Sequence, residues 1–337
     1  MSTTPFDPRD QEPFSRVTYA FAAAWQRMTW LMFTGPQARP RQWLMWGALV
    51  LLSGAVGSDF GSQVLFPGDF SSDRRAIGLP GLIELRFLVL LLGVGSLLAV
   101  IVLYLTSRMG FALLEAVLSG RPRLRGVFAS TARPGLQLFA AQLVAGLIWL
   151  VLLVPAIVAG WPAIGSVVNG RSPTGGAITL LIGAVLLWVL PLGIVAGAFM
   201  WWLNDLVIPI AWRRGLSVSS AMGVAARITS SNLGAVLLMA LGRLLVSIAA
   251  GFFSACVMCA GCCFWLPFAG AAAWMGWASW QMPAIALFTV PLGLLCALTA
   301  GWLIATLFAP LVVLRQAWAF AFVSGLDPSL GEWSDPD

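Results

Sequence analysis

Three cysteines near the C-terminal end of an apolar segment have a spacing that could support chemistry. Cys256, Cys259 and Cys263 lie on one face of a predicted helix, and Cys262 turns away from it. Thiolates at three-residue spacing can hold an iron–sulfur cluster, and thiols in an oxidising compartment can form a disulfide. The neighbours Ala255, Ala260 and Gly261 are small, so we favour a third interpretation, in which the cysteines fill a close helix contact. The prediction is therefore packing, with no metal and no cofactor.

Arg243 is the one charged residue deep inside an apolar segment. An arginine at the centre of a bilayer costs roughly 2.5–3.5 kcal/mol on insertion scales, unless it is paired or hydrated. Glu115, Asp205 and Asn204 are the candidate partners, since they lie near the ends of other apolar segments. We favour a structural role for Arg243, either in an ion pair or with its side chain reaching toward the interface. The alternative is a site for an anionic substrate or a lipid headgroup.

The residues needed for most catalytic sites are missing. The chain has no histidine, which removes the commonest general base and metal ligand. It contains no G-x-S-x-G elbow, P-loop or H-E-x-x-H motif. Glu115 and Asp205 are almost the only carboxylates near the apolar segments, and paired carboxylates can perform acid–base chemistry. A lipid-modifying enzyme is thus a third hypothesis, but we predict a protein that is not an enzyme, with no catalytic residues.

The composition is that of a membrane protein. Hydrophobic residues make up 60% of the 337 residues and charged residues 9%, against about 25% charged residues in a soluble domain. The mean hydropathy is +0.91. Uninterrupted apolar segments of at least about 18 residues are long enough to cross the hydrocarbon as helices. The prediction is an all-α integral membrane protein.

About six membrane spans are predicted, arranged as three hairpins. They cover residues 43–59, 86–107, 135–159, 177–203, 233–263 and 284–312. Every basic residue is arginine, and fourteen of the nineteen, Arg315 among them, fall in the segments on one side of these spans. The positive-inside rule makes that side cytoplasmic, together with both termini. No cleaved signal peptide is expected, because the first twenty residues lack an apolar core.

The three hairpins resemble pseudo-repeats at residues 14–120, 121–215 and 216–325 of a single transmembrane domain. Each begins with a short amphipathic helix, at 14–33, 124–132 or 217–228, expected in the cytoplasmic interface. Each returning helix, at 86–118, 176–212 or 284–320, is expected to extend beyond the bilayer. Each repeat ends at a glycine suited to a helix C-cap: Gly120, Gly215 or Gly325. Residues 1–13 and the acidic segment 326–337 are expected to be disordered.

Three stretches carry a resemblance to a known group of proteins. They are FALLEAVLSGRPRLRGVFASTARPGLQLF, DLVIPIAWRRGLSVSSAMGVAARI and the amphipathic helix that precedes RQWLMWGALVLL. They resemble a family of uncharacterised bacterial and archaeal integral membrane proteins, known as a domain of unknown function. The pattern is also similar to the membrane domain found with glycerophosphodiester phosphodiesterases. The resemblance implies a six-helix bundle with intracellular amphipathic helices, and it implies no active site.

These observations predict a multi-pass protein of the bacterial plasma (inner) membrane. The favoured function is a non-enzymatic scaffold or a lipid- or partner-binding protein, in which cytoplasmic arginines contact anionic headgroups or a protein partner. A nucleic-acid partner is not expected. The alternative is a transporter or channel-like protein with Arg243 lining an anionic substrate or lipid site.

Overall fold

The structure, a computed structural model, describes residues 12–35, 38–54, 81–122, 130–168, 174–253, 255–256 and 283–331. The regular elements in these ranges are helices, and no strand occurs among them. Along the chain, the helices are α1 (Pro13–Thr29), η2 (Trp30–Thr34), α2 (Pro40–Leu52), α4 (Gly81–Ser119), α6 (Ala132–Val168), α7 (Gly175–Ala184), η3 (Val185–Val189), α8 (Leu190–Trp202), η4 (Leu203–Val207), α9 (Ile208–Arg214), α10 (Val218–Ser231), the helix Leu233–Phe253, α12 (Pro283–Leu326) and η5 (Pro328–Leu330).

Five stretches of helix among the described residues are long and apolar enough to cross a membrane. They are Gly93–Ser119, Ala132–Ala163, Gly175–Arg214, Leu233–Phe253 and Gly301–Leu326. The prediction of a helical, multi-pass membrane protein is confirmed at this level. Of the predicted span 43–59, α2 covers the part up to Leu52, and residues 55–59 lie outside the described part of the chain.

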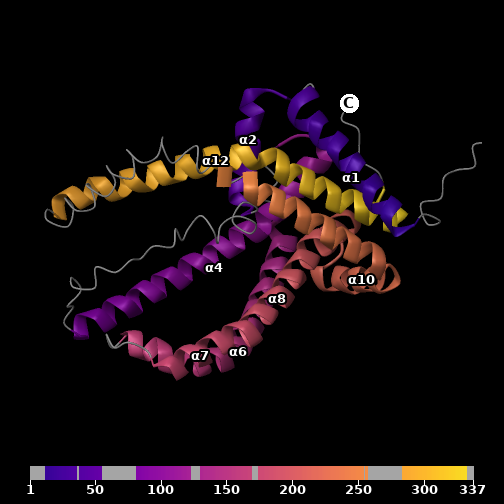
Figure 1. Cartoon of the computed structure of the whole chain (residues 1–337). Coiled ribbons are helices and arrows are strands. Elements are labelled where there is room, and N and C mark those ends of the chain that lie inside the picture. Colours follow the sequence, from indigo (N-terminus) through magenta and orange to yellow (C-terminus); the bar gives the residue numbers. More distant parts are fainter. Residues whose placement is uncertain are drawn as a thin grey trace, which may run out of the picture.

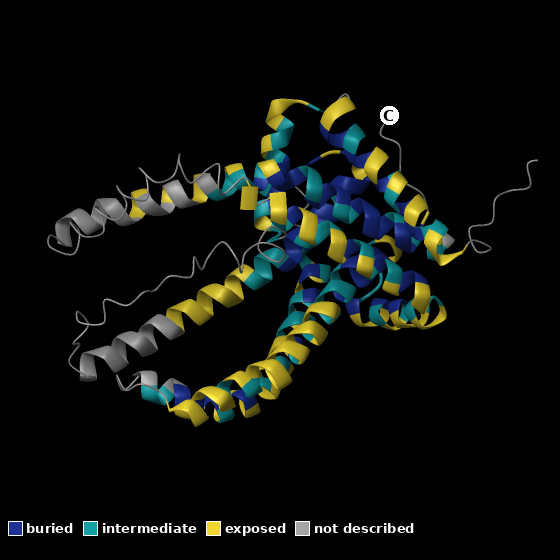
Figure 2. Ribbon diagram, in the orientation of Figure 1, coloured by how far each residue is buried: buried dark blue, intermediate teal, exposed yellow. Residues whose placement is uncertain are grey.

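The molecule has a packed core at one end, from which apolar arms diverge (Figure 1). The core is made by the C-terminal parts of α4 and α12, by η4 and α9, and by α1, α2 and α10. Figure 2 shows the buried residues gathered there, while the described parts of the arms are mostly exposed. The largest fully buried side chains include Trp46, Phe111, Phe320 and Phe322. The extension of the returning helices is thus what builds the core.

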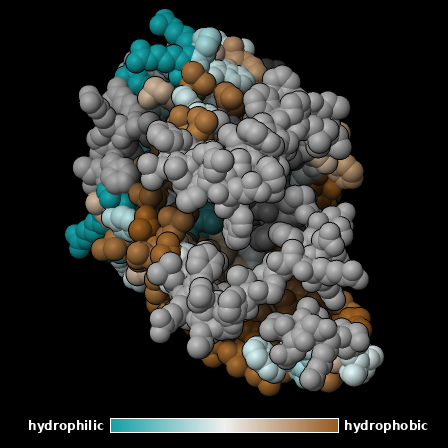
Figure 3. All heavy atoms as spheres, turned by 90° about the vertical axis from the view of Figure 1, so that its left-hand side faces the viewer, coloured by the Kyte–Doolittle hydropathy of each residue, from teal (hydrophilic) through white to brown (hydrophobic). Residues whose placement is uncertain are grey.

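The arms expose apolar side chains along their length. Leu187 is 79% exposed, and Val151, Ile194 and Phe252 are also exposed. Figure 3, seen from the arm side, shows hydrophobic residues over most of the described surface of the arms. Exposed apolar surface of this extent is costly in water but is suited to contact with lipid chains.

Two of the three predicted glycine caps have the expected conformation. Gly120 ends α4 with φ of +71°, and Gly215 ends α9 with φ of +61°; these values suit glycine because it has no Cβ. The prediction for Gly325 is wrong, since α12 continues through it to Leu326. A positive φ occurs instead at Gly331, after η5.

The helical region also extends beyond the predicted boundary at residue 325. Pro328 begins η5, and Leu330, which is 4% exposed, packs into the core. Of the segment 326–337, residues 332–337 lie outside the described part of the chain, as do residues 1–11.

Two of the three predicted surface helices correspond to helices in the described part of the chain. The first corresponds to α1 and η2, and the third to α10, whose N-cap Ser217 accepts a hydrogen bond from the backbone N–H of Ser220. The second, at 124–132, lies mostly in residues that the structure does not describe. Helix α1 packs along α12 in the core through a face that includes Val17, Ala20 and Ala24.

Arg27 is buried within this packing. Its Nη2 donates to the carbonyl of Leu118 at 2.8 Å and its Nε to that of Val117 at 3.4 Å. These carbonyls belong to the last turn of α4, where backbone acceptors lack helical partners and the helix dipole favours a cation. Arg27 therefore joins α1 to the end of α4.

Candidate functional site

Arg243 and Asp205 form an ion pair inside the core. Arg243 lies on the helix Leu233–Phe253, and its Nη1 contacts Oδ2 of Asp205 on η4. Both residues are buried, with exposed fractions of 5% and 1%. Of the partners considered from the sequence, the structure thus selects Asp205. Burial makes the pairing necessary, because a single charge in a medium of low dielectric constant is strongly destabilising.

The ion pair does not include the other two candidates for this polar site, Asn204 and Glu115. Asn204 precedes Asp205 on η4, and its side chain faces a separate cavity. Glu115 is half-buried on α4 and lines neither that cavity nor the smaller one beside Arg243. Arg108, also on α4, donates through Nη1 to the hydroxyl of Tyr104 at 2.9 Å. Arg213 lies over the ring of Phe320 at 5.2 Å.

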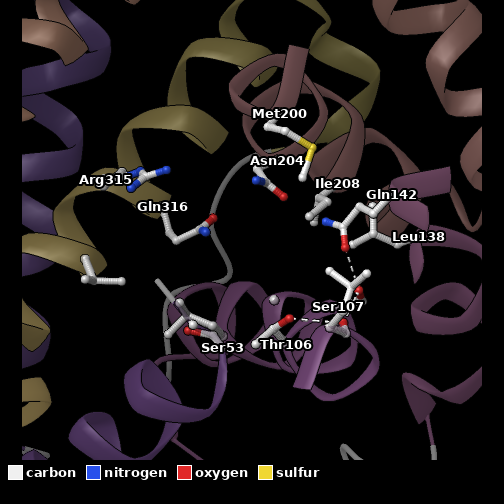
Figure 4. A pocket seen from close by; sticks show the side chains of 15 residues that line it. Ser53, Thr106, Ser107, Leu138, Gln142, Met200, Asn204, Ile208, Arg315 and Gln316 are labelled. Carbon is white, nitrogen blue, oxygen red and sulfur yellow. Dashed lines mark hydrogen bonds between the residues drawn. The ribbon is translucent and has the colours of Figure 1, made fainter. Parts of the chain in front are cut away.

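A polar cavity of about 220 Å³ lies where the arms leave the core. Five helical segments contribute to it: the end of α2, the middle of α4, the first turns of α6, the stretch from α8 to α9, and α12. The polar side chains in its lining are Ser53, Thr106, Ser107, Gln142, Asn204, Arg315 and Gln316. Figure 4 shows the amide groups of Asn204 and Gln316 facing the same space, with Ser53, Thr106 and Ser107 on its opposite side.

The two sides of the cavity differ in how their polar groups are satisfied. Ser107 Oγ lies 2.7 Å from Gln142 Oε1 and 2.6 Å from the carbonyl of Leu103, and it can donate to either. Thr106 donates to the Leu103 carbonyl at 3.0 Å. Within the described part of the chain, by contrast, no hydrogen bond is made by the side chain of Asn204, and Oε1 of Gln316 is buried without a donor. The amide of Asn204 is therefore available to a ligand or to water, whereas Oε1 of Gln316 has almost no accessible surface.

Arg315 is the charged residue of this lining, and the sequence reasoning missed it. The predicted sixth span ends at residue 312, which placed Arg315 among the cytoplasmic arginines. In the structure, α12 continues to Leu326 and carries Arg315 on the same face as Val312. A usable signal was present: Arg315 and Gln316 interrupt a long apolar stretch, PLVVL before them and AWAFAFV after them. Apolar residues on both sides of a polar pair indicate a buried helix, whereas an interfacial end would become polar and stay polar.

A second, smaller cavity of about 20 Å³ lies beside Arg243 and Arg315. Arg243 and Arg315 both line it, together with Ser247 and the ring of Trp318. Arg315 and the ion pair between Arg243 and Asp205 thus lie in one region of the core.

The proposed thiol cluster falls almost wholly outside the described residues. Cys256 is exposed and forms no disulfide within the described part of the chain, while Cys259 and Cys263 lie beyond it. The described ranges contain no group of three His, Cys, Asp or Glu side chains that could hold a metal ion. The choice between packing, a disulfide and a cluster stays a prediction.

The lining of the polar cavity suits binding more than bond breaking. It offers one guanidinium, three amides and three hydroxyls, and it contains no carboxylate or thiol among the described residues. A hydroxyl becomes a nucleophile only beside a general base, and no described residue of this lining supplies one. The arrangement can hold a polar group through hydrogen bonds and a positive charge.

Comparison with known proteins gives one match. The model of a family of unknown function, DUF7544, matches residues 17–332. Neither a curated protein nor a solved structure matches the chain. The matched region begins in α1 and ends just after η5, so it contains the core, the arms, the ion pair and the polar cavity. The chain belongs to this family of unknown function.

Proposed function

We propose that this chain is a non-enzymatic scaffold of the bacterial plasma membrane, with six spans and both termini in the cytoplasm. The buried ion pair between Arg243 and Asp205 is the observation that carries the proposal. A cation that serves a transport path must meet its substrate, whereas this cation is neutralised by a carboxylate within a packed core. Such a pair fixes the positions of helices, which is the requirement of a platform.

The outer surface of the core supplies the binding face of this platform. Its exposed arginines are Arg39, Arg41, Arg121, Arg133, Arg213, Arg214 and Arg227. Asp327 is paired with Arg214, and the buried Asp205 is paired with Arg243, so few carboxylates remain to balance this surface within the described residues. A basic surface at the cytoplasmic side of a membrane attracts anionic headgroups or an acidic protein segment. Similarity to the membrane domain found with glycerophosphodiester phosphodiesterases remains a prediction.

The orientation can be tested by cysteine labelling in a chain whose natural cysteines are replaced. Ser219, exposed on α10, is expected to react, as Ser219→Cys, with a membrane-impermeant maleimide only in inside-out vesicles. Val158, exposed toward the far end of α6, provides the matched position away from the core. Labelling of Ser219→Cys in intact cells would contradict the proposed orientation.

The platform itself can be tested by site-specific photocrosslinking in native membranes. A photoreactive residue at Ser219 is expected to capture one defined protein or an anionic lipid, and Arg227→Glu should reduce that capture several-fold. The same residue at Leu187, on an arm, should yield only lipid adducts. Equal adducts at the two positions, insensitive to Arg227→Glu, would count against a platform on this face.

Transport is the second candidate, and the polar cavity is the observation that favours it. It can be tested in proteoliposomes with trapped radiolabelled phosphate and with fluorescent phosphatidylglycerol in the bilayer. The scaffold proposal expects leakage and lipid exchange no faster than in protein-free vesicles. Flux that Arg243→Leu abolishes, in a variant that still elutes as assembled protein, would make transport the better assignment.

A further inference from the structure

We propose that the polar cavity at the base of the arms binds an uncharged group that carries two or more hydroxyls. The group can be the glycerol or sugar part of a lipid headgroup, or a free polyol. Its hydroxyls lie between the amides of Asn204 and Gln142 and the hydroxyl oxygens of Ser53, Thr106 and Ser107. The proposal goes beyond the scaffold function, because a core that engaged no protein partner would still bind this group.

Charge does not select the ligand of this cavity. Arg315 is the one charged side chain among the described residues of the lining, but its Nε and Nη1 atoms have almost no accessible surface. It also makes an interaction within the protein. The described lining contains no carboxylate that would attract a cation. The groups that the cavity offers to a ligand are therefore mostly uncharged hydrogen-bonding groups.

The side of the cavity formed by α2 and α4 offers hydrogen-bond acceptors. Each hydroxyl there uses its only proton within the protein: Ser53 donates to the carbonyl of Val50 at 2.9 Å, and Thr106 and Ser107 donate as described above. A hydroxyl has one donor and two lone pairs, so these three oxygens can still accept. They suit a ligand that donates hydrogen bonds.

The amides of the lining offer hydrogen-bond donors. Oε1 of Gln142 lies 2.7 Å from Ser107 Oγ, and Figure 4 shows the nitrogen of this amide on the side of the cavity. Among the described residues, neither this nitrogen nor the side chain of Asn204 has a hydrogen-bond partner. A ligand hydroxyl both donates and accepts, so it can join the two sets of groups. A carboxylate or phosphate only accepts and an ammonium only donates, so each would leave one set unmatched.

The size and position of the cavity suit a headgroup or a small polyol. Its volume of about 220 Å³ is below the roughly 300–1,000 Å³ of sites that enclose a drug-sized molecule. On α4 the exposed apolar residues Leu98, Ile101 and Val102 precede Leu103 and Thr106 of the lining. A lipid can therefore place its headgroup in the cavity and its chains along the arms.

The test compares the wild-type full-length chain with two variants of the cavity and one control. Asn204→Leu removes an amide that faces the cavity. Gly110→Leu fills the cavity without removing a polar group, because a Cβ at Gly110, a residue of the lining, would have only Ile208 Cδ1 within 4 Å, at 3.8 Å. Gln26→Leu is the matched control, since Gln26 is an exposed amide on α1 that does not line the cavity.

Each protein is purified in an amine-oxide detergent, which has no hydroxyl groups. It is incubated with phosphatidylglycerol, with a glucosyl diacylglycerol or with phosphatidylethanol, and retained lipid is counted by native mass spectrometry. Phosphatidylethanol has the same phosphodiester charge as phosphatidylglycerol but no hydroxyl in its headgroup. Binding of free glycerol is measured by saturation-transfer NMR.

Retention of a hydroxylated lipid at least tenfold above phosphatidylethanol, kept in Gln26→Leu and lost in Asn204→Leu and Gly110→Leu, would identify a lipid headgroup. A glycerol signal with the same dependence on the variants, without selective lipid retention, would identify a free polyol. The proposal is overturned if the wild type retains all three lipids equally and gives no glycerol signal, or if both cavity variants bind as the wild type does. If Asn204→Leu does not fold, Gly110→Leu decides, because it leaves every polar group of the cavity in place.

Discussion

Breaking the ion pair between Arg243 and Asp205 should destabilise the protein far more than breaking an exposed pair of the same chemistry. Asp205 is 1% exposed and Arg243 is 5% exposed, so either group left alone keeps a buried and uncompensated charge. Removing one partner of such a pair costs about 3–5 kcal/mol, which is roughly a hundred- to several-thousand-fold in the folding equilibrium. Asp205→Asn and Arg243→Gln should each show a loss of this size.

The chain provides its own control in the pair between Arg214 and Asp327. The side chains of this pair are 33% and 13% exposed, so solvent already screens their interaction. Exposed pairs contribute about 0.2–1 kcal/mol, and Asp327→Asn should fall near that range. The comparison separates the effect of burial from the effect of removing a carboxylate.

The measurement is equilibrium unfolding of the purified protein in a mixed detergent system, followed by tryptophan fluorescence. Trp318 lines the small cavity beside Arg243 and should report local loss of packing. The double variant of Asp205→Asn with Arg243→Gln should be at least about 1 kcal/mol more stable than the sum of the single losses, because neither charge is then stranded. Strict additivity, or a loss in Asp205→Asn no larger than in Asp327→Asn, would refute the reasoning.

Three further predictions concern helix packing and helix ends, and each is read from thermal retention of the folded protein in detergent. Gly47→Ala should destabilise the folded protein by about 1–3 kcal/mol, because the new Cβ would lie 2.8 Å from the Cα atom of Thr306 on α12. Gly93→Ala is the control: its Cβ would have nothing within 4 Å, so this variant should be neutral or stabilising. Gly120→Ala should lower the folding stability by about 1 kcal/mol, because alanine is strained at the positive φ of this residue. Gly325→Ala, inside α12, should instead raise the stability by up to about 1 kcal/mol. Losses of equal size in the two variants would contradict the assignment of Gly325 to the helix interior. Arg27→Met should lower the folding stability by about 1–3 kcal/mol, because the carbonyls at the end of α4 lose the donor that Arg27 provides. A change below about 0.5 kcal/mol would show that these hydrogen bonds do not stabilise the packing of α1 on α4.

The helical extension of the returning segments could be predicted because it depends on local sequence. The stretches 86–118, 176–212 and 284–320 stay apolar well past the length that hydrocarbon requires, and the structure continues them as helix to Ser119, Arg214 and Leu326. Arg243 could likewise be identified as needing a partner, since burial of a charge has a known cost. The sequence could not show which carboxylate pairs with Arg243, because the pairing depends on how helices that are distant in the chain pack against one another. The periodicity of a single helix contains no information on that packing.

The error at Gly325 shows where local pattern stops being informative. The three dipeptides that end the predicted repeats look alike, but a positive φ depends on the residues C-terminal to the glycine. After Gly325 the chain has only Leu326 and Asp327 before Pro328, and the backbone N–H of Asp327 still bonds the carbonyl of Val323 at 2.9 Å. The helix therefore ends against the proline, and the left-handed residue is displaced to Gly331.

The different outcomes for Arg243 and Arg315 have one physical cause. Hydropathy identified Arg243 because apolar residues surround it, and it passed over Arg315 because that residue lay just past the length assigned to a span. In the core, which these helices build where they continue past the predicted spans, position relative to a predicted span no longer predicts exposure. Arg315 faces a cavity and shares a second one with Arg243, so the two arginines belong to one polar region. One of them is paired with Asp205, and the other lines the larger cavity.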